Sequence, residues 1–167
     1  VAAFPRVLRA MSRPVHYDFD PYFQQFYENI TLKSAKAMRV KQPALILQCE
    51  PAPGIEASAA SLISPDDVVL NLASGVYGKG FGYWSARYHK EMVEIEVPYN
   101  EAIDPQQVAD AFRKRPDIKV VSLVHHDTPS GTINPAREIG KIVRDNDALL
   151  IVDAVSSFGG MDIHPDD

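Results

Sequence analysis

Three polar segments of this sequence carry side chains that could do chemistry. Asp153 directly follows the apolar run 149–152, where a buried carboxylate is costly unless a cationic group faces it. It could be a turn or capping acid, or it could hold a protonated ring nitrogen or a metal ion, and the residues leave both readings open. The run 125–132 follows another apolar stretch. Its adjacent histidines, His125 and His126, point to opposite faces of an extended segment, so it predicts a polar substrate loop rather than a metal site.

The third segment, residues 74–80, is rich in glycine. It fails the Walker pattern because Gly80 stands where Ser or Thr must follow the lysine, and its glycines are spaced G-x-G-x-G instead of G-x-G-x-x-G. It could be a flexible turn between a strand and a helix. Alternatively, its glycines could bring the backbone close to a ligand, with Tyr77 as a flat stacking face. A nicotinamide-binding oxidoreductase is an alternative that the broken fingerprint disfavours.

The elements that must position these segments alternate along the chain. Short apolar runs predict strands at residues 44–47, 68–72, 93–97, 118–124 and 148–152. Periodic segments, three of them opened by Asp20, Asp104 or Asn134 before a proline, predict helices at residues 20–39, 55–63, 104–115 and 134–146, and the glycine-rich stretch 75–82 leads into a further helix that reaches about residue 89. This alternation predicts an α/β fold with a largely parallel sheet, helices on both faces and a fully buried last strand. Ligands bind outside the carboxyl ends of such strands, where the polar segments fall.

Composition narrows the class of protein. The 167 residues are 46% hydrophobic and 23% charged, with a formal net charge of −5, which is ordinary for a globular protein and excludes a disordered chain. The acidic balance argues against a nucleic-acid binder, and no apolar run approaches the roughly 20 residues of a membrane span. Cys49 is the one cysteine, so a disulfide framework is excluded and a cytoplasmic setting is expected. We expect Cys49 to be a small buried residue rather than a nucleophile.

Residues 74–77, 125–131 and 153–160 together resemble class V, fold-type I aminotransferases, which use vitamin B6. The resemblance covers essentially the whole chain and is densest over residues 48–160. It implies the aspartate-aminotransferase-like large domain, a mostly parallel sheet flanked by helices and incomplete at the C-terminus. Residues 1–40 would then be an N-terminal segment and helix, and residues 41–167 the first part of the large cofactor- and substrate-binding domain.

The resemblance also implies roles for individual residues. Tyr77 would stack on the pyridine ring of the vitamin, and Val155 would pack on the opposite face. Asp153 would pair with the ring N–H, which keeps the ring able to draw electrons from the substrate carbon. Thr128 would lie beside the ring or its substituents. Catalytic roles are therefore expected for Asp153, Tyr77 and Thr128, all of which would also contact the ring.

The sequence departs from the family where the cofactor phosphate is normally cradled at a helix N-terminus. Residues 50–54 read Glu-Pro-Ala-Pro-Gly, so an acid and two prolines without N–H groups stand there. Repulsion between Glu50 and a phosphate would cost about 4 kcal/mol per charge pair at about 4 Å. We expect Glu50, Pro51 and Ala52 to bind a ring that carries a hydroxymethyl group instead. The alternative is that Glu50 is an exposed loop acid and that a phosphate binds elsewhere.

Within the family, this pattern resembles the members that act on free pyridoxamine. The implied reaction moves an amino group from pyridoxamine to pyruvate and gives pyridoxal and L-alanine, a step of vitamin B6 degradation. No tightly bound cofactor is then expected, and pyridoxal 5'-phosphate is the alternative, as in alanine–glyoxylate or serine–pyruvate aminotransferases. A catalytically silent, truncated chain is a further alternative.

The family's Schiff-base lysine belongs one strand beyond Asp153, but no lysine follows Lys141. Lys79 is expected to be a surface charge. The chain begins at Val1 rather than Met, and it stops at Asp167 just after a predicted strand and turn. We therefore expect a fragment that is inactive alone, and a parent enzyme that is a cytoplasmic homodimer or a higher homo-oligomer.

Overall fold

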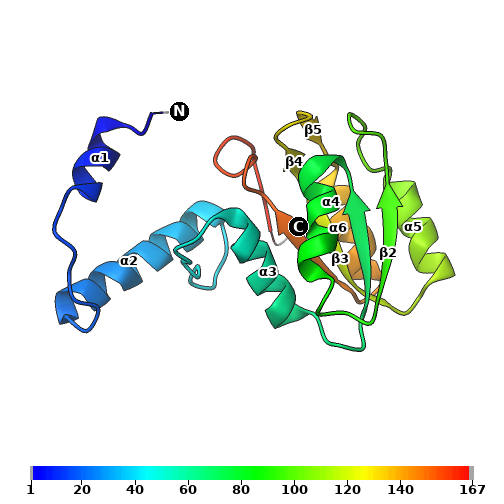
Figure 1. Cartoon of the computed structure of the whole chain (residues 1–167), viewed down its shortest axis with the longest axis horizontal. Coiled ribbons are helices and arrows are strands. Elements are labelled where there is room, and N and C mark those ends of the chain that lie inside the picture. The colour runs from blue at the N-terminus through cyan, green and yellow to red at the C-terminus, as the bar shows by residue number, and fades with distance from the viewer. Residues whose placement is uncertain (1, 166–167) are drawn as a thin grey trace. The chain divides into compact units, whose positions relative to one another are not determined.

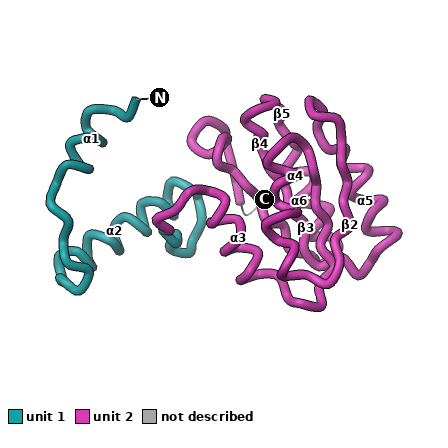
Figure 2. Tube along the Cα trace, viewed as in Figure 1, with its two compact units in different colours: residues 1–46 teal, residues 47–167 magenta. Residues whose placement is uncertain are grey.

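The computed structural model describes residues 2–165 (Figure 1). The chain divides into two units, Val1–Ile46 and Leu47–Asp167 (Figure 2). The domain boundary expected between residues 40 and 41 stays a prediction. The expectation of a fragment rested partly on the two ends of the chain. These residues, Val1 and Asp166–Asp167, lie outside the described residues.

The first unit contains helices α1 (Pro5–Met11) and α2 (Pro21–Met38). Asp20 caps α2 as predicted, because its side chain accepts a hydrogen bond from the Tyr22 N–H at 2.8 Å. The strand predicted at residues 44–47 is wrong. The apolar run has no neighbouring strand, and its backbone bonds to α2 instead: the Ala44 N–H donates to the carbonyl of Thr31. An apolar segment forms a strand only where it can hydrogen bond with the backbone of a neighbouring strand.

The second unit is built on a four-stranded parallel sheet. Its strands lie in the order β2 (Glu91–Glu96), β1 (Val68–Ala73), β3 (Ile118–Val124) and β6 (Leu149–Asp153). Every neighbouring pair is parallel, which confirms the predicted sheet. A short antiparallel hairpin of β4 (His126–Asp127) and β5 (Thr132–Ile133) follows β3 and was not predicted.

Helices cover both faces of this sheet (Figure 1). On one face, α5 (Pro105–Lys114) and α6 (Ala136–Asp145) bury Phe112 and Ile139 against β1 and β3. On the other face, α3 (Pro51–Leu62) packs Ala59 against Val69 and Val120. The last strand, β6, is only partly buried, so the prediction of full burial is wrong. It lies at the edge of the described sheet, where Leu149 is 42% exposed.

The glycine-rich segment is not a flexible turn but the first part of helix α4 (Gly75–Ser85). Its glycines let the helix lie close to β1. A Cβ on Gly78 would lie 3.1 Å from the carbonyl oxygen of Leu72, and one on Gly82 would lie 3.2 Å from the side chain of Asn71. Close packing on the sheet therefore compensates for the low helix propensity of glycine.

Asn134 was predicted to cap the helix that follows it, and this prediction is wrong. Helix α6 begins at Ala136, and no side chain caps it. The Asn134 amide instead donates to the carbonyl of Val124 at 2.7 Å and accepts from the Ile103 N–H at 2.9 Å. Asn134 thus pairs two backbone groups, the carbonyl of the last residue of β3 and the N–H of Ile103, that a capping role would leave without this partner.

Candidate active site

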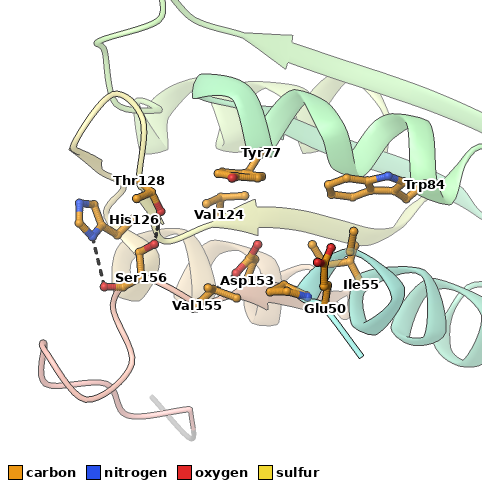
Figure 3. A pocket seen from close by; sticks show the side chains of 12 residues that line it. Glu50, Ile55, Tyr77, Trp84, Val124, His126, Thr128, Asp153, Val155 and Ser156 are labelled. Atoms are coloured by element: carbon orange, nitrogen blue, oxygen red, sulfur yellow. Dashed lines mark hydrogen bonds between the residues drawn. The ribbon is translucent and has the colours of Figure 1, made fainter. Parts of the chain in front are cut away.

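A cavity of about 200 Å³ lies within the second unit (Figure 3). A cavity of about 150 Å³ accommodates a benzene ring, so this one has room for a substituted aromatic ring. Its walls come from the start of α3, one face of α4, the ends of β3 and β6, and the segments that follow those strands. The lining residues are Glu50, Pro51, Ala52, Ile55, Tyr77, Trp84, Val124, His126, Thr128, Asp153, Val155 and Ser156.

The structure brings all the site residues expected from the sequence to this one cavity: Glu50, Pro51, Ala52, Tyr77, Thr128, Asp153 and Val155. Tyr77 and Val155 face each other across it, and the Asp153 carboxylate points between them (Figure 3). Glu50 lies toward one end and Thr128 toward the other. The arrangement suits a flat ring with polar groups on its rim, while the individual roles stay predictions.

Asp153 is placed by the sheet. It is the last residue of β6 and pairs with Val124 of β3, so it stands at the carboxyl edge of the sheet. Its carbonyl accepts from the His125 N–H at 2.9 Å, and its Oδ1 accepts from the Val155 N–H at 2.9 Å. The backbone thus holds the carboxylate in a fixed direction, where it could accept a hydrogen bond from a ring N–H.

Tyr77 is placed by the first turn of α4. Its N–H donates to Oδ1 of Asp127 at 3.1 Å, and its side chain lines the cavity; the residue as a whole is 43% exposed. The flat phenol ring offers an apolar face on which an aromatic ligand could stack.

The end of the cavity near Thr128 is rich in hydroxyl groups. Thr128 Oγ1 hydrogen bonds with Ser156 Oγ, and His126 Nδ1 lies 3.4 Å from the carbonyl oxygen of Ser156. The neighbouring His125 does not line the cavity, and its Nδ1 lies 3.0 Å from Ser157 Oγ. Burial, and secondarily the charge of His126, lower the pKa of His125, so its ring is neutral at pH 7.

The opposite end is formed by the N-terminus of α3. Glu50 occupies the N-cap position, but its side chain accepts no capping hydrogen bond. Among the first three residues of the helix, Pro51 and Pro53 lack N–H groups and Ala52 retains one, whereas the N–H of Gly54 belongs to the first hydrogen bond within the helix. Cys49, which was expected to be buried, is exposed, because the segment that carries it forms no strand of the sheet.

Five lining residues were not named individually as site residues from the sequence, although His126 belongs to the predicted substrate loop: Ile55, Trp84, Val124, His126 and Ser156. Trp84 follows Tyr77 by seven residues, which puts both on one face of a helix, so that spacing could have found it. Ile55 lies one turn beyond Pro51 for the same reason. Val124 and Ser156 are close in sequence to expected residues, and only the three-dimensional structure shows that they line the cavity.

The lysine of the glycine-rich segment lies outside the cavity lining. Lys79 forms ion pairs with Glu94 and Glu96, and its pKa is raised chiefly by the hydrogen bonds to these two carboxylates. Within residues 2–165, no three His, Cys, Asp or Glu side chains gather in a way that could hold a metal ion. No helix among these residues is long and apolar enough to cross a membrane.

Comparison with known proteins identifies relatives of the chain. The family described as Aminotransferase class-V matches residues 81–167. The pyridoxamine–pyruvate transaminase of Mesorhizobium japonicum is 64% identical over 167 residues, which are all of this chain and 42% of that protein. The (S)-ureidoglycine–glyoxylate transaminase of Bacillus subtilis is 36% identical over 98% of this chain and 39% of its own. The chain thus spans about two fifths of the length of these relatives.

Solved structures agree with the observed fold. The pyridoxamine–pyruvate aminotransferase from Mesorhizobium loti matches with a TM-score of 0.95 and 64% identity, over 99% of this chain and 42% of that chain. The alanine–glyoxylate aminotransferase from Nostoc matches with a TM-score of 0.90 and 27% identity, over 96% of this chain and 43% of its own. The predicted fold-type I large domain is therefore confirmed.

These relatives correct one expectation. Class V aminotransferases depend on pyridoxal 5'-phosphate, so the expectation that no cofactor is tightly bound is wrong, and the alternative agrees with the family. The cavity fits the pyridine ring of this cofactor, since Tyr77 offers a flat face and Asp153 an acceptor for the ring N–H. The lining fits the phosphate less well than the ring, because the Ala52 N–H is the one free donor among the first three residues of α3 and the Glu50 carboxylate stands beside it.

The family match leaves the nicotinamide-binding alternative without support, because the glycine-rich segment is a helix packed on β1 and carries a cavity wall. The parallel sheet, the cavity at its carboxyl edge and the matched residues 81–167 agree with one another. The chain belongs to the class V aminotransferase family.

Proposed function

We propose that this chain is the N-terminal part of an aminotransferase that moves an amino group from pyridoxamine to pyruvate and gives pyridoxal and L-alanine. The observation that carries the proposal is the 64% identity, over the whole chain, to a pyridoxamine–pyruvate transaminase. Relatives named for other amino donors are less similar, such as the alanine–glyoxylate aminotransferase of Drosophila melanogaster at 32%. The reacting lysine that the family requires would lie in the remaining part of the protein.

The cavity supports a vitamin B6 ring as the bound group. When such a ring is bound, its pyridine nitrogen, kept protonated, draws electron density from the carbon that loses its proton. Asp153 would hold that nitrogen proton. Tyr77 and Val155 would hold the two faces of the ring, and Thr128 would orient a substituent on its rim. These residues thus bind and orient the ring.

Glu50 is proposed to select the form of the pyridoxamine substrate. A hydroxymethyl group can donate a hydrogen bond to its carboxylate, whereas a phosphate ester brings a second negative charge to the same end of the cavity. At about 4 Å, that repulsion is about 4 kcal/mol per charge pair, or roughly a thousandfold in affinity. Free pyridoxamine is therefore the preferred amino donor.

The test uses the full-length protein with pyridoxamine and pyruvate, and measures pyridoxal and L-alanine. We expect turnover with pyridoxamine and at least a hundredfold lower kcat/KM with pyridoxamine 5'-phosphate. Glu50→Gln should lower the ratio of kcat/KM for pyridoxamine to kcat/KM for pyridoxamine 5'-phosphate at least tenfold. Glu101→Gln, which changes an exposed acid outside the cavity, should leave this ratio unchanged. Turnover of alanine and glyoxylate but not of pyridoxamine would instead assign the enzyme to the alanine–glyoxylate type.

We also propose that the full-length enzyme is a cytoplasmic homodimer. The proposal rests on the family resemblance and on a chain whose one cysteine can form no disulfide within it. Sedimentation of the purified full-length protein tests the dimer, and a monomer at micromolar concentration would overturn it.

A further inference from the structure

Asp127 is a fully buried acid that does not line the cavity, yet it contacts two of the segments that form it. Its Oδ1 accepts from the N–H of Tyr77 at 3.1 Å. Its Oδ2 accepts from the N–H of Ser130 at 3.1 Å and from the Ser130 hydroxyl at 2.8 Å. One carboxylate therefore joins the helix that carries Tyr77 to the hairpin loop that carries Thr128.

Helix α4 depends on this contact because it has no side-chain cap of its own. Its N-cap residue is Ser74, whose hydroxyl donates to the carbonyl of Glu101 at 2.8 Å instead. A carboxylate at the N-terminus of a helix accepts an otherwise unpaired N–H and interacts favourably with the helix dipole. Asp127 provides this from a part of the chain 50 residues away.

Gly75 makes room for the carboxylate. Its φ is +75°, and a Cβ at this position would overlap the carboxylate carbon of Asp127. Any other residue at position 75 would have to displace Asp127 from the helix N-terminus. The first turn of α4 and the buried acid are thus fitted to each other, and the fit sets where the Tyr77 backbone lies.

We propose that Asp127 is a positioning residue, which fixes the position of Tyr77 on one wall of the cavity relative to Thr128 at one end of it. The inference rests on the proposed function, because its consequence is the affinity for the vitamin B6 ring. Without the link, α4 and the hairpin loop are free to shift separately, and the width of the ring site is no longer fixed. Asp127 acts through Tyr77 and does not touch the ring.

Asp127→Asn tests the link with little change of shape. A carboxamide has one oxygen, so it can accept from the Tyr77 N–H or from Ser130, but not from both, and its NH₂ group meets a donor on the other side. In the full-length protein without pyruvate, pyridoxamine binding is measured from its fluorescence. We expect about tenfold weaker binding, the size of effect typical for a hydrogen bond to a charged group.

A double-mutant cycle separates positioning from general destabilisation. In the Tyr77→Ala background the aromatic wall is absent, so Asp127→Asn should weaken binding less than about threefold. Equal losses in both backgrounds would overturn the proposal. Asp104→Asn is the matched control, since Asp104 caps α5 through the Gln106 N–H at 2.9 Å and lies outside the cavity, and it should leave binding unchanged.

Ser130→Ala gives a milder second variant if Asp127→Asn does not fold. It removes one donor to Oδ2 and leaves the Tyr77 contact, so we expect binding to weaken two- to threefold with Tyr77 present and to stay unchanged with Tyr77→Ala. Unchanged binding with Tyr77 present would contradict the positioning role. Failure of the unsubstituted protein to bind pyridoxamine would overturn the proposed function itself, which is a different result from normal binding that is insensitive to Asp127.

Discussion

The N–H of Val155 donates to Oδ1 of Asp153 at 2.9 Å, so the acid that points into the cavity is held by the residue that forms the opposite wall from Tyr77. The bond spans two residues and closes a tight turn directly after β6. The direction of the carboxylate is therefore set locally by the backbone, and no other side chain is needed to aim it.

This local bond makes Asp153→Asn a clean test of the charge at position 153. Asparagine keeps an oxygen for the Val155 N–H, so the turn is expected to survive, but it cannot stabilise a protonated ring nitrogen. We predict that kcat for pyridoxamine and pyruvate falls at least a hundredfold, as is typical when a preorganised electrostatic contact is removed. Steady-state kinetics on the full-length protein measures it. A fall of less than threefold would show that Asp153 does not support the ring.

Tyr77 is predicted to act through its ring face rather than its hydroxyl group. Tyr77→Phe keeps the flat face and should bind pyridoxamine within about threefold of the unsubstituted protein. Tyr77→Ala removes the contact area and should weaken binding about tenfold or more. Fluorescence titration distinguishes the two. A large loss in Tyr77→Phe would instead place the hydroxyl group in contact with the ligand.

The sequence predicted the sheet because its strands are apolar runs bounded by turns and helix starts. The strand at residues 118–124 has the predicted bounds, and the expected site residues meet because most of them follow strands whose carboxyl ends share one edge. The run at residues 44–47 is equally apolar but finds no neighbouring strand, and this depends on tertiary structure that local composition does not contain.

Other features could not be predicted because they depend on contacts between distant residues. The helix at residues 75–85 contains glycines that disfavour helix in isolation, and only its close packing on β1 explains it. Asn134 has the sequence context of a helix cap, but its side chain hydrogen bonds with the backbone of Val124 and Ile103 instead. The contact of Asp127 with Tyr77 spans 50 residues and leaves no local signature.

Asn71 is predicted to be the most sensitive polar residue of the β1–α4 contact. It is fully buried in β1, its oxygen accepts from the Ser122 hydroxyl at 2.6 Å, and its amide donates to Glu94 at 2.9 Å and to the carbonyl of Gly78 at 3.2 Å. Although burial opposes the effect, hydrogen bonds from Lys79 and Asn71 lower the pKa of Glu94. Removing Asn71 therefore takes the acceptor from the buried Ser122 hydroxyl and one donor from Glu94, and it opens a cavity in β1.

We expect Asn71→Ala to lower the free energy of unfolding by about 2–4 kcal/mol. Ser122→Ala leaves only the Asn71 oxygen unpaired and should cost about 1–2 kcal/mol. Because both changes break the same bond, the double variant should lose less than the sum. Urea denaturation of the full-length protein measures these values, and strict additivity would contradict the network.

His89 is predicted to make stability depend on pH. Both of its ring nitrogens are buried without a hydrogen-bond partner among the described residues, and burial lowers its pKa from the usual value of about 6.5. Below about pH 6.5 the unfolded chain therefore takes up a proton that the folded chain does not. The free energy of unfolding should fall as the pH decreases, with a slope of at most about 1.4 kcal/mol per pH unit for this one group.

His89→Leu should remove this contribution. At pH 8 the variant should be as stable as the unsubstituted protein or about 1 kcal/mol more stable, because two unpaired polar atoms leave the interior. Between pH 7 and pH 5 its stability should fall less steeply. His16→Leu, a change at an exposed histidine, serves as the control and should keep the original slope. Urea denaturation at several pH values measures both, and equal slopes for His89→Leu and the unsubstituted protein would show that His89 does not stay neutral in the folded state.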